Sequence, residues 1–156
     1  MSDYDAIIST PVGLIGVCTD GVAVTQIDLN LSPTAERKAG SRVGAETVDF
    51  LRCYFETGQW SADTPLQLSG TEFQQRVWDS LLAIPPGDAV TYGELAGQLK
   101  SSARAIGQAC RRNPSPIVVP CHRVVAASGL GGFAGATAGA MSDIKRWLLH
   151  HEGIDL

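Results

Sequence analysis

The stretch PIVVPCHRVVAASG, residues 116–129, places a thiol, an imidazole and a guanidinium side by side between two apolar runs. The apolar residues on both sides are typical of buried strands. Pro120 suits the start of a helical turn, because a backbone N–H at that position has no partner in any case. We therefore expect strands on both sides and, between them, one helical turn that presents Cys121 and His122.

Cys121 has the surroundings of a candidate nucleophile. An unperturbed cysteine has a pKa of ~8.5, so only a few per cent is thiolate at neutral pH. Backbone N–H groups at the start of the turn are expected to favour the anion. His122 can accept the thiol proton, directly or through a water, if a third group such as Glu152 orients its ring. A thiol hydrolase would need another histidine, and only His150 and His151 remain.

Composition indicates a globular chain of one domain or two small lobes. The chain has 156 residues, of which 44% are hydrophobic and 18% charged. Neither a membrane helix of ~20 apolar residues nor a signal peptide is recognisable, so the expected location is the cytoplasm, with no membrane partner. The four cysteines form no CxxC pair, which argues against a zinc finger or a disulfide framework. Apart from Cys121, they are expected to be small buried hydrophobes.

Charge is distributed unevenly along the chain. The net charge is −4, with nine acidic and four basic residues in 1–70 and seven acidic and eight basic residues in 71–156. No acidic residue lies between Glu94 and Asp143. The second half therefore predicts either a locally positive face that meets nucleic acid or an ordinary solvated helix face.

The first 70 residues predict a small β-rich lobe. The runs YDAIIST, GLIGVCT and GVAVTQIDL are rich in Ile and Val and are separated by turn residues, which indicates an antiparallel meander. SPTAERKAGS reads as a polar loop. AETVDFLRCYFETG predicts a helix with Val48, Leu51 and Phe55 on one face and Gly58 as its C-cap. We place the lobe boundary near Gly70.

The remainder predicts a mainly helical lobe. TEFQQRVWDSLLAI opens with Thr71 and Gln74 in capping-box spacing, and Thr91 with Glu94 repeats that spacing before YGELAGQL. YGELAGQL and ARAIGQACRR form a helix-turn-helix whose second helix is basic. SDIKRWLLHHEG predicts a last helix with Ser142 as its N-cap.

Small side chains dominate the second helix of that pair, at Ala103, Ala105, Gly107 and Ala109. They suit either close packing against another helix or close approach to a DNA groove with Arg104 projecting, and the residues alone leave both open. GLGGFAG lacks the strand-turn-helix context of a dinucleotide loop and is expected to form a pocket wall beside the thiol.

Several of these segments together resemble the O6-alkylguanine-DNA alkyltransferase family. They are FQQRVWDSLLAIPPGDAVTYGELA, ARAIGQACRRNP, NPSPIVVPCHRVV, GLGGFAG and KRWLLHHEG, and they cover residues 71–153 almost continuously. The resemblance implies an α+β fold. Residues 1–70 would form a small ribonuclease-H-like antiparallel sheet lobe, and residues 71–156 a helical lobe with a winged-helix-like helix-turn-helix and the PCHR active site.

The resemblance also implies roles for individual residues. Cys121 would accept the alkyl group, and His122, polarised by Glu152, would take the thiol proton through a water. Asn113 would brace this network, and Tyr92 would donate a hydrogen bond to the guanine. Arg104 would fill the stack after base flipping, with its helix in the minor groove. The other expected DNA contacts are Tyr92, Gly93, Ala103, Ala105 and Gly107, and the expected pocket residues are Cys110, Val124, Phe133, Ala134 and Gly135.

The implied activity is direct-reversal DNA repair, with one irreversible alkyl transfer per molecule. The partner would be double-stranded DNA containing O6-alkylguanine, with O4-alkylthymine left open as a second lesion. We expect a monomer with no cofactor and no metal. Arg123 is expected to be structural and paired with a carboxylate, and His151 to be a helix-end residue. The alternative is a non-enzymatic sensor that binds alkyl lesions, and the presence of Cys121 argues against it. A plain transcription factor would not need the PCHR sequence.

Overall fold

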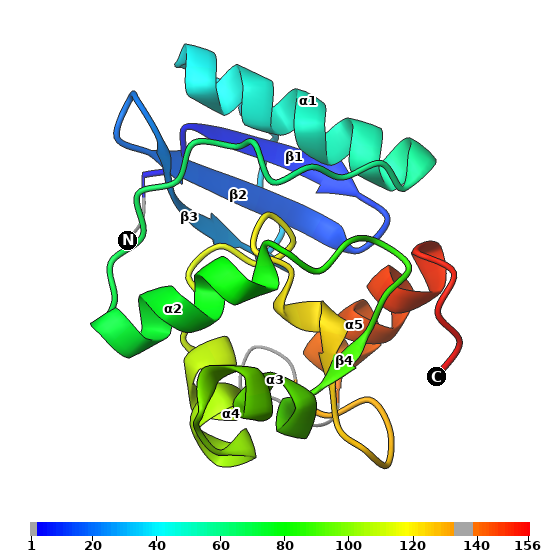
Figure 1. Cartoon of the computed structure of the whole chain (residues 1–156). Helices are drawn as coiled ribbons and strands as arrows, with labels where there is room; N and C mark the ends of the chain where they lie inside the picture. The colour runs from blue at the N-terminus through cyan, green and yellow to red at the C-terminus, as the bar shows by residue number, and fades with distance from the viewer. Residues whose placement is uncertain (1–2, 133–138) are drawn as a thin grey trace. The chain divides into compact units, whose positions relative to one another are not determined.

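The computed structural model describes residues 3–132 and 139–156 and has a mixed α+β fold (Figure 1). The chain folds into two compact units. The first unit comprises the chain up to Ser69 together with Pro114–Val118. The second comprises Gly70–Asn113 and Val119–Leu156.

The first unit is built on a three-stranded antiparallel sheet in the order β1-β2-β3, as the meander pattern predicts. Its strands are β1 (Ala6–Thr10), β2 (Gly13–Thr19) and β3 (Val24–Asp28). Ile and Val side chains of these strands are buried, and helix α1 (Arg42–Thr57) runs along the sheet (Figure 1). The sheet and this helix thus enclose one apolar core.

Helix α1 begins earlier than the sequence pattern predicts. Ser41 is its N-cap, and the Ser41 hydroxyl accepts a hydrogen bond from the Gly44 N–H. Gly58 is the C-cap with φ 78°, which confirms that prediction. The buried stripe centres on Thr47, Leu51 and Tyr54, whereas Val48 and Phe55 are only half-buried. The face of α1 that is buried is therefore rotated from the predicted one.

Pro114–Val118 returns to the first unit but does not form the strand predicted before Pro120. Ile117 is fully buried with φ 73°, and its carbonyl accepts a hydrogen bond of 2.9 Å from Trp60 Nε1. The Pro114 carbonyl accepts another, of 2.9 Å, from the Ile27 N–H of β3. Prolines at 114, 116 and 120 remove the N–H groups that a strand ladder needs, so the apolar run folds into turns instead.

The second unit contains four helices among its described residues, together with a two-stranded parallel pairing. Its elements are α2 (Glu72–Leu81), β4 (Val90–Thr91), α3 (Tyr92–Leu99), α4 (Ala103–Arg111), the 3₁₀ turn η1 (Cys121–Arg123), β5 (Val124–Val125) and α5 (Ala140–His151). The Thr71–Gln74 capping box is confirmed. At Thr91 only half of the box forms, since the Thr91 hydroxyl accepts from the Glu94 N–H but itself donates to the Glu94 carboxylate.

Helix α5 corrects one further prediction. Its N-cap is Gly139 and not Ser142, which lies within the helix and is 8% exposed. Ser142 cannot cap the helix because the chain is already helical from Ala140. In the described ranges, no helix is long and apolar enough to cross a membrane.

Candidate active site

The thiol of Cys121 lies on the 3₁₀ turn η1, directly after Pro120, where the sequence predicts a helical turn. The Val119 carbonyl accepts two hydrogen bonds of 2.8 Å, one from the Cys121 N–H and one from Asn113 Nδ2. Asn113 follows the C-terminal end of α4, so this amide joins the helix to the segment that leads into the turn. The thiol is therefore held between two elements of the second unit.

Burial dominates the ionisation of Cys121. Its side chain is 6% exposed, and this burial raises the pKa of the thiol above its ordinary value. A hydrogen bond from Asn113 and the charge of Lys145 act in the opposite direction but do not outweigh burial. A backbone hydrogen bond at the turn also lowers the pKa of Cys121, as expected, but burial outweighs it, so the anion is not favoured overall. At rest Cys121 is a thiol and needs a base.

The candidate base is His122, the next residue in the chain after Cys121. His122 Nε2 lies 2.6 Å from Glu152 Oε2, and both side chains are fully buried. Because Nε2 faces a carboxylate, we assign the ring proton to Nε2, which leaves Nδ1 as the acceptor. Nδ1 is buried and has no hydrogen-bond partner among the described residues. Burial lowers the pKa of His122, against the opposing effect of Glu152, so the ring is neutral and can accept a proton.

Arg123 is buried and paired, as the sequence predicts. Its Nε donates to Glu152 Oε1 at 2.7 Å, its Nη2 donates to Oε2 at 3.2 Å, and its Nη1 donates to the Ile84 carbonyl at 2.6 Å. The Glu152 carboxylate therefore accepts from the guanidinium and the imidazole together.

Tyr92 opens helix α3, and its hydroxyl donates to the Gly132 carbonyl at 3.4 Å. Burial raises the pKa of Tyr92 to about 12, so the hydroxyl remains a donor at neutral pH. Gly131, with φ 74°, approaches the Tyr92 ring so closely that an added Cβ would lie 3.0 Å from Cε2. The described part of the glycine loop thus lies close to the Tyr92 ring, and this approach together with the positive φ favours glycine at position 131.

Sequence reasoning missed Lys145. The side chain is fully buried on α5, and its Nζ donates to the carbonyls of Val124 at 2.7 Å and Gly132 at 2.9 Å. Burial lowers the pKa of Lys145 to about 8, and Nζ lies 5.8 Å from the centroid of the Tyr92 ring. A signal was present in the spacing, because Lys145 precedes Leu148 and Leu149 by three and four residues and so shares their apolar face.

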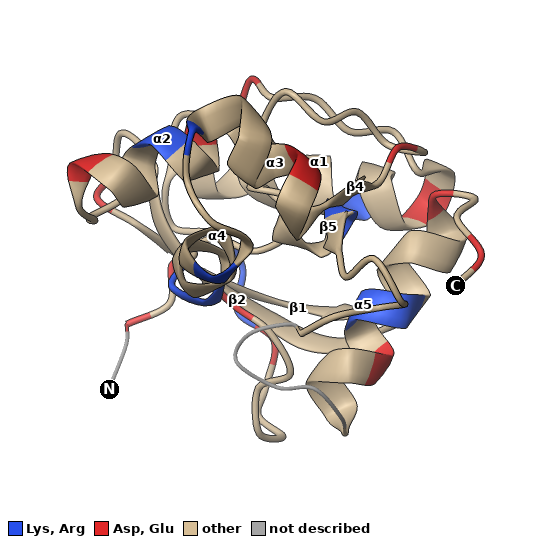
Figure 2. Cartoon of the chain, turned by 60° about the horizontal axis from the view of Figure 1, so that its bottom comes forward, with Lys and Arg blue, Asp and Glu red and all other residues tan. Residues whose placement is uncertain are grey.

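The small residues of helix α4 differ in exposure: Ala103 is exposed, Ala105 and Gly107 are half-buried, and Ala109 is buried. Arg104 and Ala103 are exposed, and a Cβ added at Gly107 would meet no atom of the described residues within 4 Å. Close packing within the described chain therefore does not explain Gly107. Gly93, at the start of α3, is also exposed. Lys and Arg residues, coloured blue in Figure 2, occur on α2, α4 and α5.

The expected pocket residues divide into two groups. Cys110 and Val124 are buried, and burial together with the neighbouring Cys121 raises the pKa of Cys110. Phe133, Ala134 and Gly135 lie outside the described residues. Within the described part of the chain, no cluster of three His, Cys, Asp or Glu side chains has a metal-binding arrangement.

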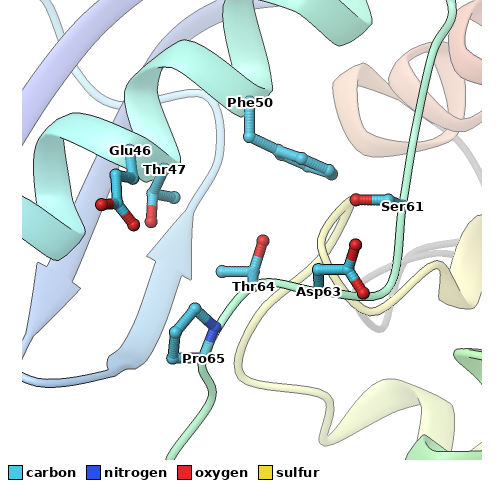
Figure 3. A pocket seen from close by; sticks show the side chains of 7 residues that line it. All are labelled: Glu46, Thr47, Phe50, Ser61, Asp63, Thr64 and Pro65. Atoms are coloured by element: carbon cyan, nitrogen blue, oxygen red, sulfur yellow. The ribbon is translucent and has the colours of Figure 1, made fainter.

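The first unit contains a small cavity whose lining differs from the residues around Cys121 (Figure 3). It has a volume of about 180 Å³, and it is lined by Glu46, Thr47, Phe50, Ser61, Asp63, Thr64 and Pro65. These side chains include carboxylates and hydroxyls but neither a thiol nor an imidazole. No expected site residue lines it.

Comparison with known proteins adds independent findings. Residues 72–154 match the family model described as 6-O-methylguanine DNA methyltransferase, DNA binding domain. A methylated-DNA–protein-cysteine methyltransferase of Mycobacterium leprae is 42% identical over 139 residues, which is 82% of each chain. One of the same name from Methanosarcina acetivorans is 37% identical over 160 residues, covering 96% of this chain and 98% of the relative.

Solved structures agree with these relatives. The crystal structure of Mycobacterium tuberculosis OGT in complex with DNA superposes with a TM-score of 0.80 at 37% identity, covering 94% of this chain and 91% of that one. The matched length includes the sheet unit as well as the thiol site. The chain therefore belongs to the 6-O-methylguanine DNA methyltransferase family.

Proposed function

We propose that this protein is a methylated-DNA–protein-cysteine methyltransferase that repairs O6-alkylguanine in double-stranded DNA by moving the alkyl group to Cys121. One observation carries the proposal: the buried thiol of Cys121 is followed in the chain by His122, a buried neutral imidazole whose Nδ1 has no partner among the described residues. Membership of the family supplies the substrate class. The alternative of a lesion sensor is disfavoured, since binding alone needs no such thiol.

The transfer is one displacement at the alkyl carbon. The thiol proton passes through a water to His122 Nδ1, and the sulfur of Cys121 forms a bond to the alkyl carbon as the bond from that carbon to O6 breaks. The electron pair of the broken bond stays with the guanine. The guanine takes up one proton at N1, which balances the proton that the thiol released.

Several buried groups assist this step. Glu152 fixes the His122 ring through the 2.6 Å contact with Nε2, which leaves Nδ1 as the nitrogen that accepts the proton. Asn113 supports the thiol, and Tyr92 donates a hydrogen bond to the guanine as negative charge develops on it. Cys110 and Val124 contribute apolar wall, and Phe133, Ala134 and Gly135 are assigned to that wall from the sequence alone.

DNA is approached through α3 and α4. A target base inside a duplex must be flipped out, at a cost of about a few kcal/mol. Arg104 projects from exposed helix α4 and fills the vacated position in the stack. Gly93, Ala103, Ala105 and Gly107 keep the surface low enough for the minor groove, where sequence readout is slight. The open space at Gly107 supports this assignment.

The finer details of the architecture belong to the same proposal. The sheet lobe, residues 1–70, is ribonuclease-H-like, and residues 71–156 form the alkyltransferase lobe with a winged-helix-like helix-turn-helix. The antiparallel sheet under α1 and the α3–α4 pair beside β4 and β5 support these assignments. The protein acts as a monomer in the cytoplasm.

The product is a thioether, from which water does not displace the thiolate, so each molecule reacts once. We would mix the protein with an excess of duplex carrying one O6-methylguanine and count restored guanines per protein. The expected result is a stop at one equivalent, and none for Cys121→Ser although that variant still binds the duplex. Repeated turnover would contradict the suicide mechanism, and lesion binding without repair would favour the sensor.

A further inference from the structure

We propose that Arg123 is a positioning residue of the alkyl-transfer site: it keeps Glu152 ionised and fixed, so that His122 stays neutral with Nδ1 available to the thiol proton. The inference rests on the proposed function. It goes beyond a structural salt bridge because it assigns Arg123 an effect on the protonation of a second residue.

The geometry around Glu152 leaves little freedom. Arg123 Nε contacts Oε1 at 2.7 Å, while His122 Nε2 at 2.6 Å and Arg123 Nη2 at 3.2 Å both contact Oε2. All three side chains are buried from solvent, and the Ile84 carbonyl fixes the guanidinium from the other side at 2.6 Å. The carboxylate is therefore held in one plane by a two-point contact with the guanidinium.

Charge balance decides where the proton can reside. Arg123 and Glu152 neutralise each other, so a proton added to His122 would be a buried positive charge without a counter-charge of its own. Without Arg123, the buried carboxylate would have His122 as its cationic partner, and an imidazolium–carboxylate pair would form. Both ring nitrogens would then carry protons, and Nδ1 would no longer be an acceptor.

Other charged groups near His122 do not replace Arg123 in this role. Cys121 on η1 is a thiol at rest, and Lys145 on α5 disfavours the imidazolium in the same direction as Arg123. Lys145 Nζ, however, donates to two carbonyls and not to Glu152 in the described contacts. Helix α2 also contacts η1, but its titratable residues Glu72, Arg76 and Asp79 are solvent-exposed.

Nitrogen-15 NMR of the histidine rings tests the proposal without any DNA. The chain has three histidines, and the His122→Gln variant identifies the signals of His122, while His150 and His151 serve as internal references. We expect wild-type His122 to remain neutral with the proton on Nε2 at pH 6.5. In Arg123→Met the pKa of His122 should rise by about one unit or more. Arg123→Lys, which keeps the charge but loses the two-point contact, should give a smaller rise.

The rate of alkyl transfer gives the second readout. If Arg123 acts through His122, the acidic limb of the pH–rate profile should move to higher pH in Arg123→Met by the same amount as the His122 titration. A merely structural role would lower the melting temperature and leave both titrations in place. Unchanged His122 titration and tautomer in the folded variants would overturn the proposal.

Two controls keep the experiment decisive. Arg123→Met removes the guanidinium that neutralises the buried Glu152 carboxylate, which can prevent folding. In that case the test uses Arg123→Lys, and this variant must show a raised His122 pKa. The double variant Arg123→Met with Glu152→Gln removes both charges and should return the pKa of His122 toward the wild-type value. If the NMR result holds while wild-type protein transfers no alkyl group from DNA, the proposed function fails and the electrostatic role of Arg123 stands.

Discussion

Each unit of the molecule contains a carboxylate that accepts hydrogen bonds from two neighbouring side chains. In the first unit, which contains the three-stranded sheet and is called the sheet unit here, Asp28 accepts from Tyr4 at 2.6 Å and from Gln26 at 2.8 Å. In the second unit, which contains Cys121 and is called the thiol unit here, Glu152 accepts from His122 and Arg123. The Asp28 network is partly exposed, whereas the Glu152 network is fully buried. Burial strengthens each charge interaction in the second network and makes an unsatisfied atom there costly.

The two networks show how a fold separates stability from reactivity. The Tyr4 hydroxyl uses its proton on Asp28, and that hydrogen bond raises the pKa of Tyr4 to about 12, so the group is inert at neutral pH. His122, the residue after Cys121, instead has a buried acceptor, Nδ1, with no partner among the described residues. A buried polar atom without a protein partner calls for an explanation, and the proposed proton transfer gives one.

The largest expected contrast between the networks concerns alkyl transfer. His122→Gln should lower the single-turnover rate about 100-fold or more, because a positioned base contributes that much to a proton transfer. Tyr4→Phe, the matched change in the sheet network, should leave the rate unchanged. Rapid-quench kinetics on a duplex with one O6-methylguanine measures both. Equal losses in the two variants would mean that His122 acts only through stability.

Contact with DNA should also depend on residues of the second unit, which contains the thiol, and not on those of the first. Arg104→Ala removes an exposed side chain of α4 and should reduce transfer from duplex DNA about 10- to 100-fold. The proposed reason is that no side chain would then occupy the place that the flipped base leaves in the stack. Arg52→Ala, an exposed arginine of α1, is the charge-matched control and should be silent. Both variants should melt as the wild type does. A comparable loss in Arg52→Ala would indicate a general charge effect.

Acid should destabilise the protein through His122 of the buried network. The pKa of folded His122 is lowered, so the unfolded chain binds more protons below pH ~6.5 and the free energy of unfolding falls as the pH drops. The slope should approach about 1.4 kcal/mol per pH unit until the folded pKa is passed. Urea titrations from pH 7 to 5 should show this extra slope in wild type and Tyr4→Phe. It should be missing from His122→Gln, and its persistence there would assign it to another group.

The smallest effect is expected for stability in the sheet network. Tyr4→Phe removes one partly buried hydrogen bond to Asp28 and should lower the free energy of unfolding by about 1 kcal/mol at neutral pH. Urea denaturation monitored by circular dichroism measures the change. A loss several times larger would show that Asp28 depends on Tyr4 as strongly as Glu152 depends on its partners.

Local patterns are sufficient for much of the fold. The alternating Ile and Val runs predict the antiparallel sheet, and Thr71 with Gln74 predicts the start of α2, because these features depend on residues close in sequence. The strand predicted before Pro120 is absent, because the prediction relied on the apolar residues and the prolines of that run prevent a strand ladder. The N-cap of α5 is misplaced at Ser142, because a serine in capping spacing can also lie inside a helix.

The candidate site is predictable only in part. Cys121 and His122 are adjacent in the sequence, and the pairing of Arg123 with a carboxylate follows from the cost of a buried charge. The two carbonyls that Lys145 bridges, and the contact between Gly131 and the Tyr92 ring, join elements far apart in the chain. The raised pKa of Cys121 depends on the burial of its side chain. Burial could not be predicted from the neighbouring residues in the sequence alone.

Every role assigned to the thiol unit depends on Cys121 being the alkyl acceptor. Intact mass spectrometry after incubation with duplex O6-methylguanine, followed by peptide mapping, tests this directly. We expect one added methyl group per molecule, located on Cys121 and absent from Cys18, Cys53 and Cys110. A methyl group on another residue, or an unchanged mass with the lesion consumed, would contradict the assignment.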